Sequence, residues 1–244
     1  HDYGCKTERH KRGYFMRNPL SKTIVTIKPS GIRKFFDLVN EMEGVISLGV
    51  GEPDFDTPWH IRDEGIYALE KGKTFYTSNS GLTELRQEIA NYIKRTQGVT
   101  YDPKKEIMVT VGGSEAIDVA FRAMLDPEDE VLIPEPSYVS YVPCAVLAGG
   151  KPVIIDLKAE NDFRLTAEEV IEKITEKTKI LVLPFPNNPT GSVMGKEELE
   201  KIAKVVIEKD IFVLSDEIYA ELTYNGKHVS ITSIEGMRER TVLI

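Results

Sequence analysis

The stretch KILVLPFPNNPTGSV, residues 179–193, places a loop of prolines and asparagines directly after a short apolar run. The run from Ile180 to Leu183 contains no polar residue, which is typical of a strand that is covered on both faces. A charged segment with helical spacing follows from Lys196. The stretch therefore predicts a buried strand, a loop that carries Asn188, and a helix.

The same order of strand, loop and helix recurs along the chain. Short apolar runs predict strands at 106–111, 129–134, 151–157, 179–184, 211–216 and 241–244. Amphipathic spacing predicts helices at 59–71, 82–97, 114–124, 137–148, 166–175 and 196–208, with Thr166 and Glu169 spaced as a capping box. This alternation predicts an α/β fold with a mainly parallel sheet sandwiched by helices.

Composition excludes several classes of partner. The chain has 244 residues, 41% of them hydrophobic, which indicates a globular fold. Its net charge of -8 argues against the basic face that binding to nucleic acid or an anionic membrane requires. No apolar run approaches the roughly 20 residues of a membrane span, and no signal peptide is recognisable, so we expect a cytoplasmic protein.

The two cysteines, Cys5 and Cys144, form no disulfide framework, and we expect no metal site. Residues 1–15 are polar and irregular, and we expect them to be a non-native leader that ends before Met16.

Ligands of an open parallel sheet bind outside the carboxyl ends of its strands. One such end carries VGGSEA, residues 111–116, whose glycines precede a predicted helix start at Ser114. Free N–H groups at a helix start suit a phosphate, although a tight turn capped by Ser114 explains the same residues. The segment matches neither the dinucleotide-binding nor the nucleoside-triphosphate glycine pattern, which disfavours both classes.

Three other strand ends carry unusual side chains. Tyr138 and Tyr141 follow a proline, where a ring could lie flat on a heteroaromatic ligand or, alternatively, pack on the core. Asp216 ends an apolar strand and needs a partner, either a cationic ring nitrogen or backbone amides, and Tyr219 could add a phenol to the same site. The amide of Asn188 could donate to a phenolate oxygen, and the alternative is an ordinary Asn-Pro turn.

Together, six motifs resemble the class I aminotransferases, which are pyridoxal-phosphate enzymes of fold type I. They are GEPDFDTP (51–58), FYTSNSGLTELR (75–86), VGGSEA (111–116), EPSYVSY (135–141), PNNPTG (186–191) and SDEIY (215–219). The resemblance runs from about residue 20 to residue 244, and SGIRKF (30–35) is closest to the aspartate, aromatic and diaminopimelate-type branch. It implies that residues 16–60 form an N-terminal arm and part of a small domain, and that residues 61–244 form the large cofactor-binding domain.

The resemblance assigns roles to residues of the cofactor site. The backbone of Gly113, Ser114 and Glu115 would hold the phosphate of pyridoxal 5'-phosphate, with the Glu115 side chain turned away. Tyr138 would stack on the pyridine ring, Asn188 and Tyr219 would bond its 3-oxygen, and Asp216 would pair with its protonated nitrogen.

It also assigns roles in substrate binding and assembly. Gly51 would lie beside the substrate carboxylate, and Tyr138 and Asn188 would also border the substrate. Tyr76 would reach the phosphate of a neighbouring subunit, which implies a homodimer. The implied activity is transfer of an amino group from an amino acid to a 2-oxo acid.

The sequence departs from the family pattern in its catalytic groups. The Schiff-base lysine and the arginine that binds the substrate carboxylate have no counterpart, and the lysine is expected a few residues beyond Ile244. We therefore expect an incomplete large domain and an inactive N-terminal portion of an aminotransferase. Three alternatives remain: a carbon-sulfur β-lyase of the same fold, a non-catalytic binding or regulatory module that kept the fold, and, less favoured, a nucleotide- or methyl-donor-binding domain.

Overall fold

The computed structural model describes residues 17–28, 44, 46, 51 and 55–244. These residues divide into two compact units, one with residues 17–28, 91–101 and 110–244 and one with residues 44, 46, 51, 55–90 and 102–109. The expected leader lies outside the described residues. The expected boundary at residue 60, between an arm and a large domain, stays a prediction.

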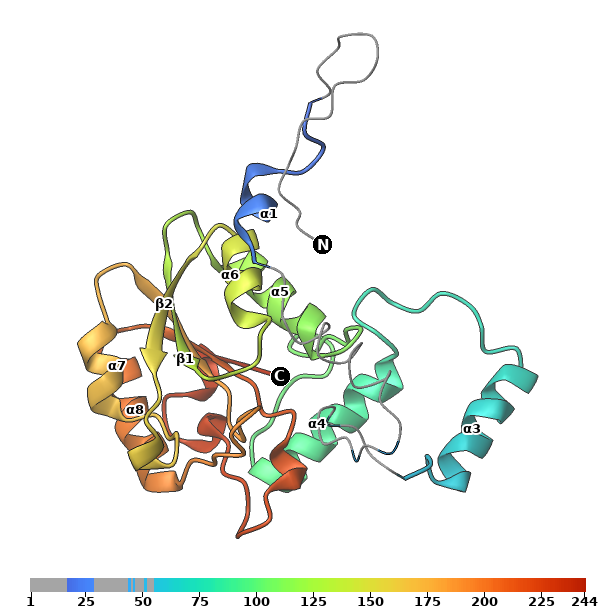
Figure 1. The fold of residues 1–244 in the computed structure, drawn as a ribbon. Coiled ribbons are helices and arrows are strands. Elements are labelled where there is room, and N and C mark those ends of the chain that lie inside the picture. Colours follow the sequence, from blue (N-terminus) through green and yellow to red (C-terminus); the bar gives the residue numbers. More distant parts are fainter. Residues whose placement is uncertain (1–16, 29–43, 45, 47–50, 52–54) are drawn as a thin grey trace, which may run out of the picture. The chain divides into compact units, whose positions relative to one another are not determined.

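The first unit is built on a five-stranded sheet with the order β2-β1-β3-β4-β5 (Figure 1). Every neighbouring pair is parallel, which confirms the predicted α/β class. The strands are β1 (Glu130–Glu135), β2 (Lys151–Asp156), β3 (Thr178–Leu183), β4 (Phe212–Ser215) and β5 (Thr241–Leu243). Each lies within a residue or two of its predicted range, because an uninterrupted apolar run is a strong signal for a buried strand.

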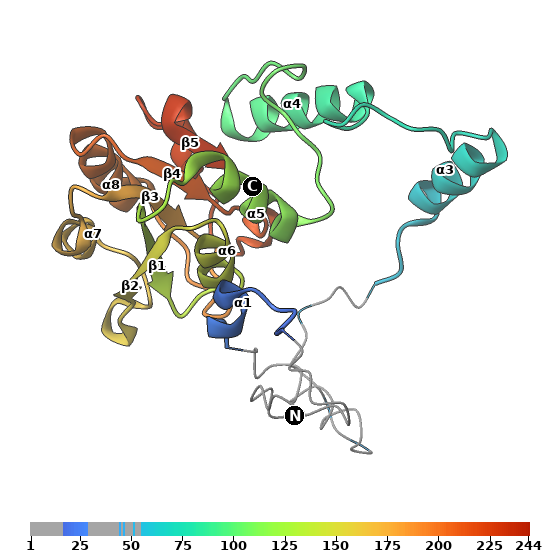
Figure 2. The same cartoon turned by 90° about the horizontal axis from the view of Figure 1, so that it is seen from above.

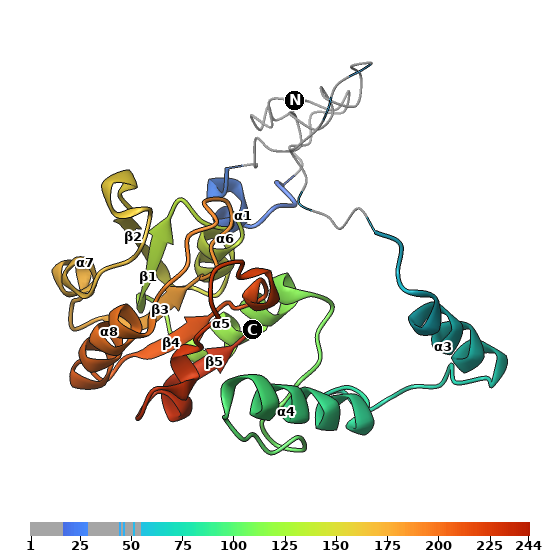
Figure 3. The same cartoon turned by 90° about the horizontal axis from the view of Figure 1, so that it is seen from below.

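Helices cover both faces of this sheet (Figures 2 and 3). On one face, α7 (Ala167–Lys173) and α8 (Lys196–Glu208) pack on strand residues that include Leu181 and Val213. On the other face, α5 (Gly113–Met124) and α6 (Tyr141–Leu147) pack on residues that include Val182 and Leu214. Successive strand residues thus pack into two separate hydrophobic cores, as the alternation of side chains along a strand requires.

Local sequence signals set several helix ends. The predicted capping box is present, with Thr166 Oγ1 accepting from Glu169 N (3.2 Å) and the Glu169 carboxylate accepting from Thr166 N (3.0 Å). The range predicted for α8 agrees with the structure. The remaining short elements of this unit are α1 (Lys22–Thr26) and the 3-10 helices Ala159–Asn161, Ala220–Leu222, Ile231–Ser233 and Arg238–Arg240.

Two predicted elements need correction. The helix expected at 137–148 begins only at Tyr141, because residues 137–140 form a loop and turn before the first helical hydrogen bond, from Cys144 N to Ser140 O. The strand expected at 106–111 is not formed in the described chain. A strand needs a neighbour to pair its backbone, and Val109 N instead donates to Ser80 O in the preceding loop (3.0 Å).

The second unit contains α3 (Trp59–Glu70) and the first half of α4 (Thr83–Gln97), which continues into the first unit. Arg86 of α4 is buried and donates to the Lys104 carbonyl (3.3 Å). None of the described helices combines the length and the apolar composition that a membrane span needs.

Candidate active site

A cavity of about 160 Å³ opens where the carboxyl ends of β1, β3 and β4 meet the start of α5. It brings together most of the predicted site residues, namely Gly113, Ser114, Tyr138, Asn188, Asp216 and Tyr219. The rest of its lining consists of Ile117, Tyr141, Pro184, Pro186 and Ile218. All of these residues belong to the unit that contains the sheet.

Among the described residues that line this cavity, Asp216 is the only carboxylate. It directly follows β4, and only 7% of its surface is exposed. Its Oδ2 accepts from Tyr141 Oη (2.7 Å) and its Oδ1 accepts from Ile218 N (3.3 Å). Burial raises the pKa of Asp216, the Tyr141 and Ile218 hydrogen bonds oppose the rise, and the charge of Glu217 adds to it. A buried carboxylate with neutral donors alone favours a cation that enters the cavity.

Tyr141 supports this carboxylate from helix α6. The side chain is 2% exposed, and its ring meets Tyr138 edge-on, with centroids 5.7 Å apart and planes at 82°. Burial and the nearby charge of Asp216 raise the pKa of Tyr141, so the phenol keeps its proton and acts as a donor. The sequence suggested either stacking or core packing for Tyr141, and its bond to Asp216, 75 residues away, has no local signal.

The start of α5 forms another part of the cavity wall. Gly112 precedes the helix with φ +81° and provides no side-chain cap, so the N–H groups of the first turn stay available. Ser114 Oγ lies 2.9 Å from Tyr138 Oη, which links this helix start to the aromatic wall. The Glu115 carboxylate accepts a hydrogen bond from Val111 N and does not line the cavity.

The two asparagines of the PNNPTG loop have different environments. Asn187 is buried, and its Oδ1 accepts from Thr190 N (3.2 Å) and Thr190 Oγ1 (3.0 Å), which closes the turn. Asn188 is exposed and lines the cavity next to Pro186. The Asn188-Pro189 peptide bond is cis. Asn187 therefore holds the loop, and Asn188 lines the cavity.

Tyr76 and Gly51 belong to the other unit. Both are exposed there, and Tyr76 has no shielding from described residues. The predicted contact of Tyr76 with a second subunit and the predicted place of Gly51 beside a substrate stay predictions.

The cavity offers a donor set that fits pyridoxal 5'-phosphate. Backbone N–H groups at the α5 start suit a phosphate, the Tyr138 ring suits a flat heterocycle, and buried Asp216 suits a protonated ring nitrogen. Asn188 and Tyr219 add an amide and a phenol. The described residues that line the cavity include no lysine.

Comparison with known proteins identifies the family of this chain. The family described as "Aminotransferase class I and II" matches residues 43–244. The chain belongs to this aminotransferase family.

Similar proteins come from several organisms. The chain is 48% identical over 224 residues to aromatic-amino-acid aminotransferase 2 of Thermococcus litoralis, covering 91% of the chain and 58% of that protein. It is also 48% identical over 226 residues to an aspartate aminotransferase of Pyrococcus abyssi, covering 92% of the chain and 58% of that protein.

A solved structure described as aspartate aminotransferase from Thermus thermophilus with maleate superposes with a TM-score of 0.87 at 40% identity, covering 93% of the chain and 60% of that structure. The chain thus spans about three fifths of the length of the relatives it matches.

Proposed function

We propose that this chain binds pyridoxal 5'-phosphate in the cavity at the sheet edge and forms the cofactor-binding part of an aminotransferase. The observation that carries the proposal is that buried Asp216 and the uncapped start of α5 line the same cavity. A planar molecule with a pyridinium nitrogen and a phosphate offers a partner to each of these two groups.

The proposal assigns a role to each polar group of the site. The Gly113, Ser114 and Glu115 amides hold the phosphate, and the Tyr138 ring lies against the pyridine. Asp216 keeps a proton on the ring nitrogen, since its carboxylate has no formal positive partner among the lining residues that the structure describes. Tyr141 holds that carboxylate in place through its 2.7 Å hydrogen bond.

The ring oxygen would be held by two further groups. Asn188 donates its amide and Tyr219 its phenol, so that the cofactor is oriented at three points. When bound, pyridoxal phosphate supplies the electron sink that transfer of an amino group between an amino acid and a 2-oxo acid requires. The names of the similar proteins, which are all aminotransferases, favour this reaction over a carbon-sulfur β-lyase.

Substrates and assembly are part of the same proposal. The substrates are an amino acid and a 2-oxo acid, with Gly51, Tyr138 and Asn188 beside them, and Tyr76 completes the site of a second subunit in a homodimer. Because the part of the cavity lining that the structure describes contains no lysine, the 244-residue chain is proposed to bind the cofactor without a covalent bond.

The test is a binding titration of the 244-residue chain. Pyridoxal 5'-phosphate should bind saturably, pyridoxal without phosphate should bind more weakly, and Asp216→Ala should weaken both. After borohydride treatment, peptide mapping should show no uniquely modified lysine. Absence of saturable binding, or equal binding by the wild type and Asp216→Ala, would contradict the proposal.

A further inference from the structure

A second buried carboxylate lies directly after Asp216. Glu217 is 6% exposed and does not line the cavity. Side chains alternate along a strand, and Ser215 and Glu217 accordingly border the core of the α8 face, whereas Asp216 faces α6 through Tyr141. Consecutive carboxylates thus occupy opposite sides of one strand end.

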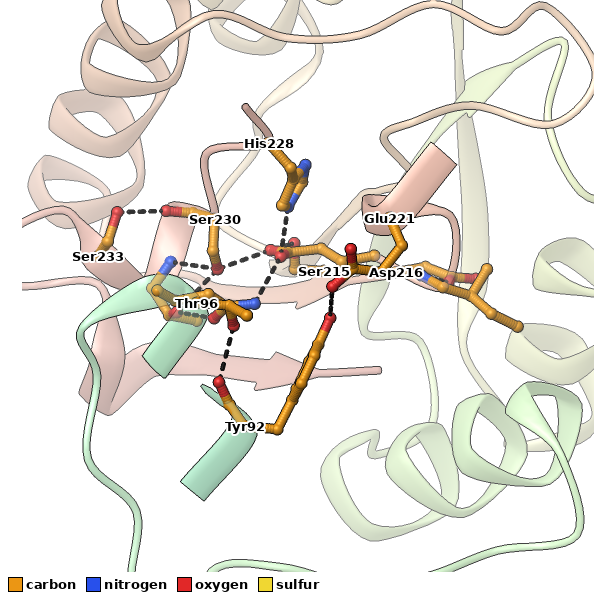
Figure 4. A network of polar contacts seen from close by, with 12 residues as sticks. Tyr92, Thr96, Ser215, Asp216, Glu221, His228, Ser230 and Ser233 are labelled. Atoms are coloured by element: carbon orange, nitrogen blue, oxygen red, sulfur yellow. Dashed lines mark hydrogen bonds and ion pairs between the residues drawn. The ribbon is translucent and has the colours of Figure 1, made fainter. Parts of the chain in front are cut away.

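Glu217 is the centre of a hydrogen-bond network. Its Oε1 accepts from Ser215 Oγ (2.8 Å) and Ser230 Oγ (2.8 Å). Its Oε2 lies 2.6 Å from His228 Nε2 and 3.4 Å from Gln97 Nε2. Figure 4 shows the dashed contacts that join Ser215, His228 and Ser230 in this network.

The partners of Glu217 come from separate parts of the chain. Gln97 ends α4, and His228 and Ser230 lie in the segment after β4. The backbone adds to this anchor, because Glu217 N donates to Ile244 O (2.8 Å) and Ile244 N donates to Ser215 O (2.9 Å). The chain on both sides of Asp216 is therefore tied down by contacts that do not involve the cavity.

We propose that Glu217 is a positioning residue whose buried carboxylate fixes the end of β4 and thereby holds Asp216 toward the ring nitrogen of the bound cofactor. This inference rests on the proposed function of the cavity. Asp216 depends on the anchor for its own geometry, because its Oδ1 is bonded to Ile218 N, the amide that follows Glu217. Tyr219, which lines the cavity, lies on the same short segment.

The charge of Glu217 acts in the same direction. It contributes to raising the pKa of Asp216, after the larger effect of burial. A second negative charge close to Asp216 favours a pyridinium in the cavity. Position and charge thus make Glu217 act on the cofactor through Asp216, without touching it.

The first test compares Glu217→Gln with Glu130→Gln in the 244-residue chain. Glu130 is also 6% exposed and also hydrogen-bonded, by Thr175 Oγ1 (2.6 Å) and Lys151 Nζ (3.4 Å), but it lies at the amino end of β1, away from the cavity. Both variants lose a buried carboxylate. Only Glu217→Gln should raise the Kd for pyridoxal 5'-phosphate, by about tenfold, which is the lower end of the loss seen when a group that orients a ligand's partner is removed.

A readout in the cofactor-free chain separates this inference from the proposed function. The titration of Asp216, followed by carboxyl 13C NMR, should move to a lower pKa in Glu217→Gln and stay unchanged in Glu130→Gln. If the wild-type chain fails to bind pyridoxal 5'-phosphate, the proposed function is contradicted, while this titration still tests whether Glu217 acts on Asp216. An Asp216 titration and a Kd that are both unchanged in folded Glu217→Gln would overturn the inference.

A second pair of variants covers the case in which Glu217→Gln does not fold. His228→Leu removes the donor to Glu217, whereas His228→Gln keeps a nitrogen donor at a similar reach. His228→Leu should raise the Kd for pyridoxal 5'-phosphate several-fold, and His228→Gln should restore most of the affinity. Equal affinity of the two His228 variants would overturn the positioning role.

Discussion

Tyr141 donates a 2.7 Å hydrogen bond to Asp216 and joins the start of α6 to the end of β4 across the cavity wall. Both side chains are almost completely buried, so water does not replace this bond. The bond occupies Oδ2 of Asp216, and Ile218 N occupies part of Oδ1 at the longer distance of 3.3 Å. The carboxylate is thus oriented before any ligand arrives, which lowers the cost of ordering the site on binding.

Tyr141→Phe tests this relationship without emptying the core. The variant keeps the ring and loses only the donor, so the Asp216 carboxylate stays buried with one partner fewer. We expect the free energy of unfolding near neutral pH to fall by about 1–3 kcal/mol, the usual cost of a buried polar group that loses its partner. Urea denaturation of the wild type and the variant measures this change, and an unchanged midpoint would contradict the role of the bond.

The same variant should change how cofactor binding depends on pH. The Tyr141 hydrogen bond lowers the pKa of Asp216, so its removal raises that pKa above the wild-type value. A carboxyl with a higher pKa is neutral up to a higher pH, and a neutral carboxyl does not pair with a pyridinium. The acid side of the affinity profile for pyridoxal 5'-phosphate should therefore move to higher pH in Tyr141→Phe. Affinity measured at a series of pH values, from the ordinary pKa of a carboxyl upward to neutral pH, follows this change.

Asp216→Asn should stabilise the cofactor-free chain and weaken its binding of the cofactor. Burial raises the pKa of Asp216, which means that the ionised carboxylate is disfavoured in the folded chain. The folded chain therefore holds the Asp216 proton to a higher pH than the unfolded chain does, and this residue costs stability as pH rises above the unfolded pKa. We expect Asp216→Asn to stabilise the cofactor-free chain by roughly 1 kcal/mol near neutral pH and to lose most of its cofactor affinity.

The pH dependence of that stabilisation is its control. Below the ordinary pKa of an aspartate both states carry a neutral carboxyl, so the gain from Asp216→Asn should vanish there. Thermal or urea unfolding at acid and neutral pH measures the difference. A gain of equal size at both pH values would show that the charge of Asp216 is not its source.

The sequence predicted the parts of this molecule that local pattern determines. Apolar runs placed the sheet strands, and the spacing of Thr166 and Glu169 placed a helix start, because burial on both faces and capping leave marks within a few residues. The strand expected at 106–111 was wrong, since its apolar pattern does not provide the neighbour that a strand needs. The Tyr141–Asp216 bond and the Glu217 network join distant segments, and no local pattern encodes such pairs.

Thr166→Ala tests the capping box that begins α7. The variant removes the oxygen that accepts from Glu169 N, and the expected loss is about 1 kcal/mol in the free energy of unfolding. Thr166→Ser keeps the hydroxyl and should keep most of the stability. Because α7 covers the face of the sheet that lies away from α5 and α6, neither variant should change the affinity for pyridoxal 5'-phosphate. A weaker cofactor affinity would show that α7 and the cavity are coupled.

Gly112 tests the helix start as a phosphate site. Its φ of +81° and ψ of 169° lie in a region that only glycine occupies readily, so Gly112→Ala should strain or shift the turn before α5 at a cost of about 1–3 kcal/mol. Apart from Gly112 and its two chain neighbours, no described residue has a heavy atom within 4 Å of the added Cβ, so the expected strain comes from the backbone conformation. The affinity for pyridoxal 5'-phosphate should fall in Gly112→Ala, whereas the weaker binding of phosphate-free pyridoxal should change little.

Gly98 supplies the matched control. It also has a positive φ, +76°, with open space around its added Cβ, and it follows α4 instead of preceding α5. Gly98→Ala should therefore lower stability without changing the ratio of pyridoxal 5'-phosphate affinity to pyridoxal affinity. If Gly112→Ala leaves that ratio unchanged as well, the phosphate is not held at the start of α5. The backbone N–H groups at that helix start would then have no part in cofactor binding.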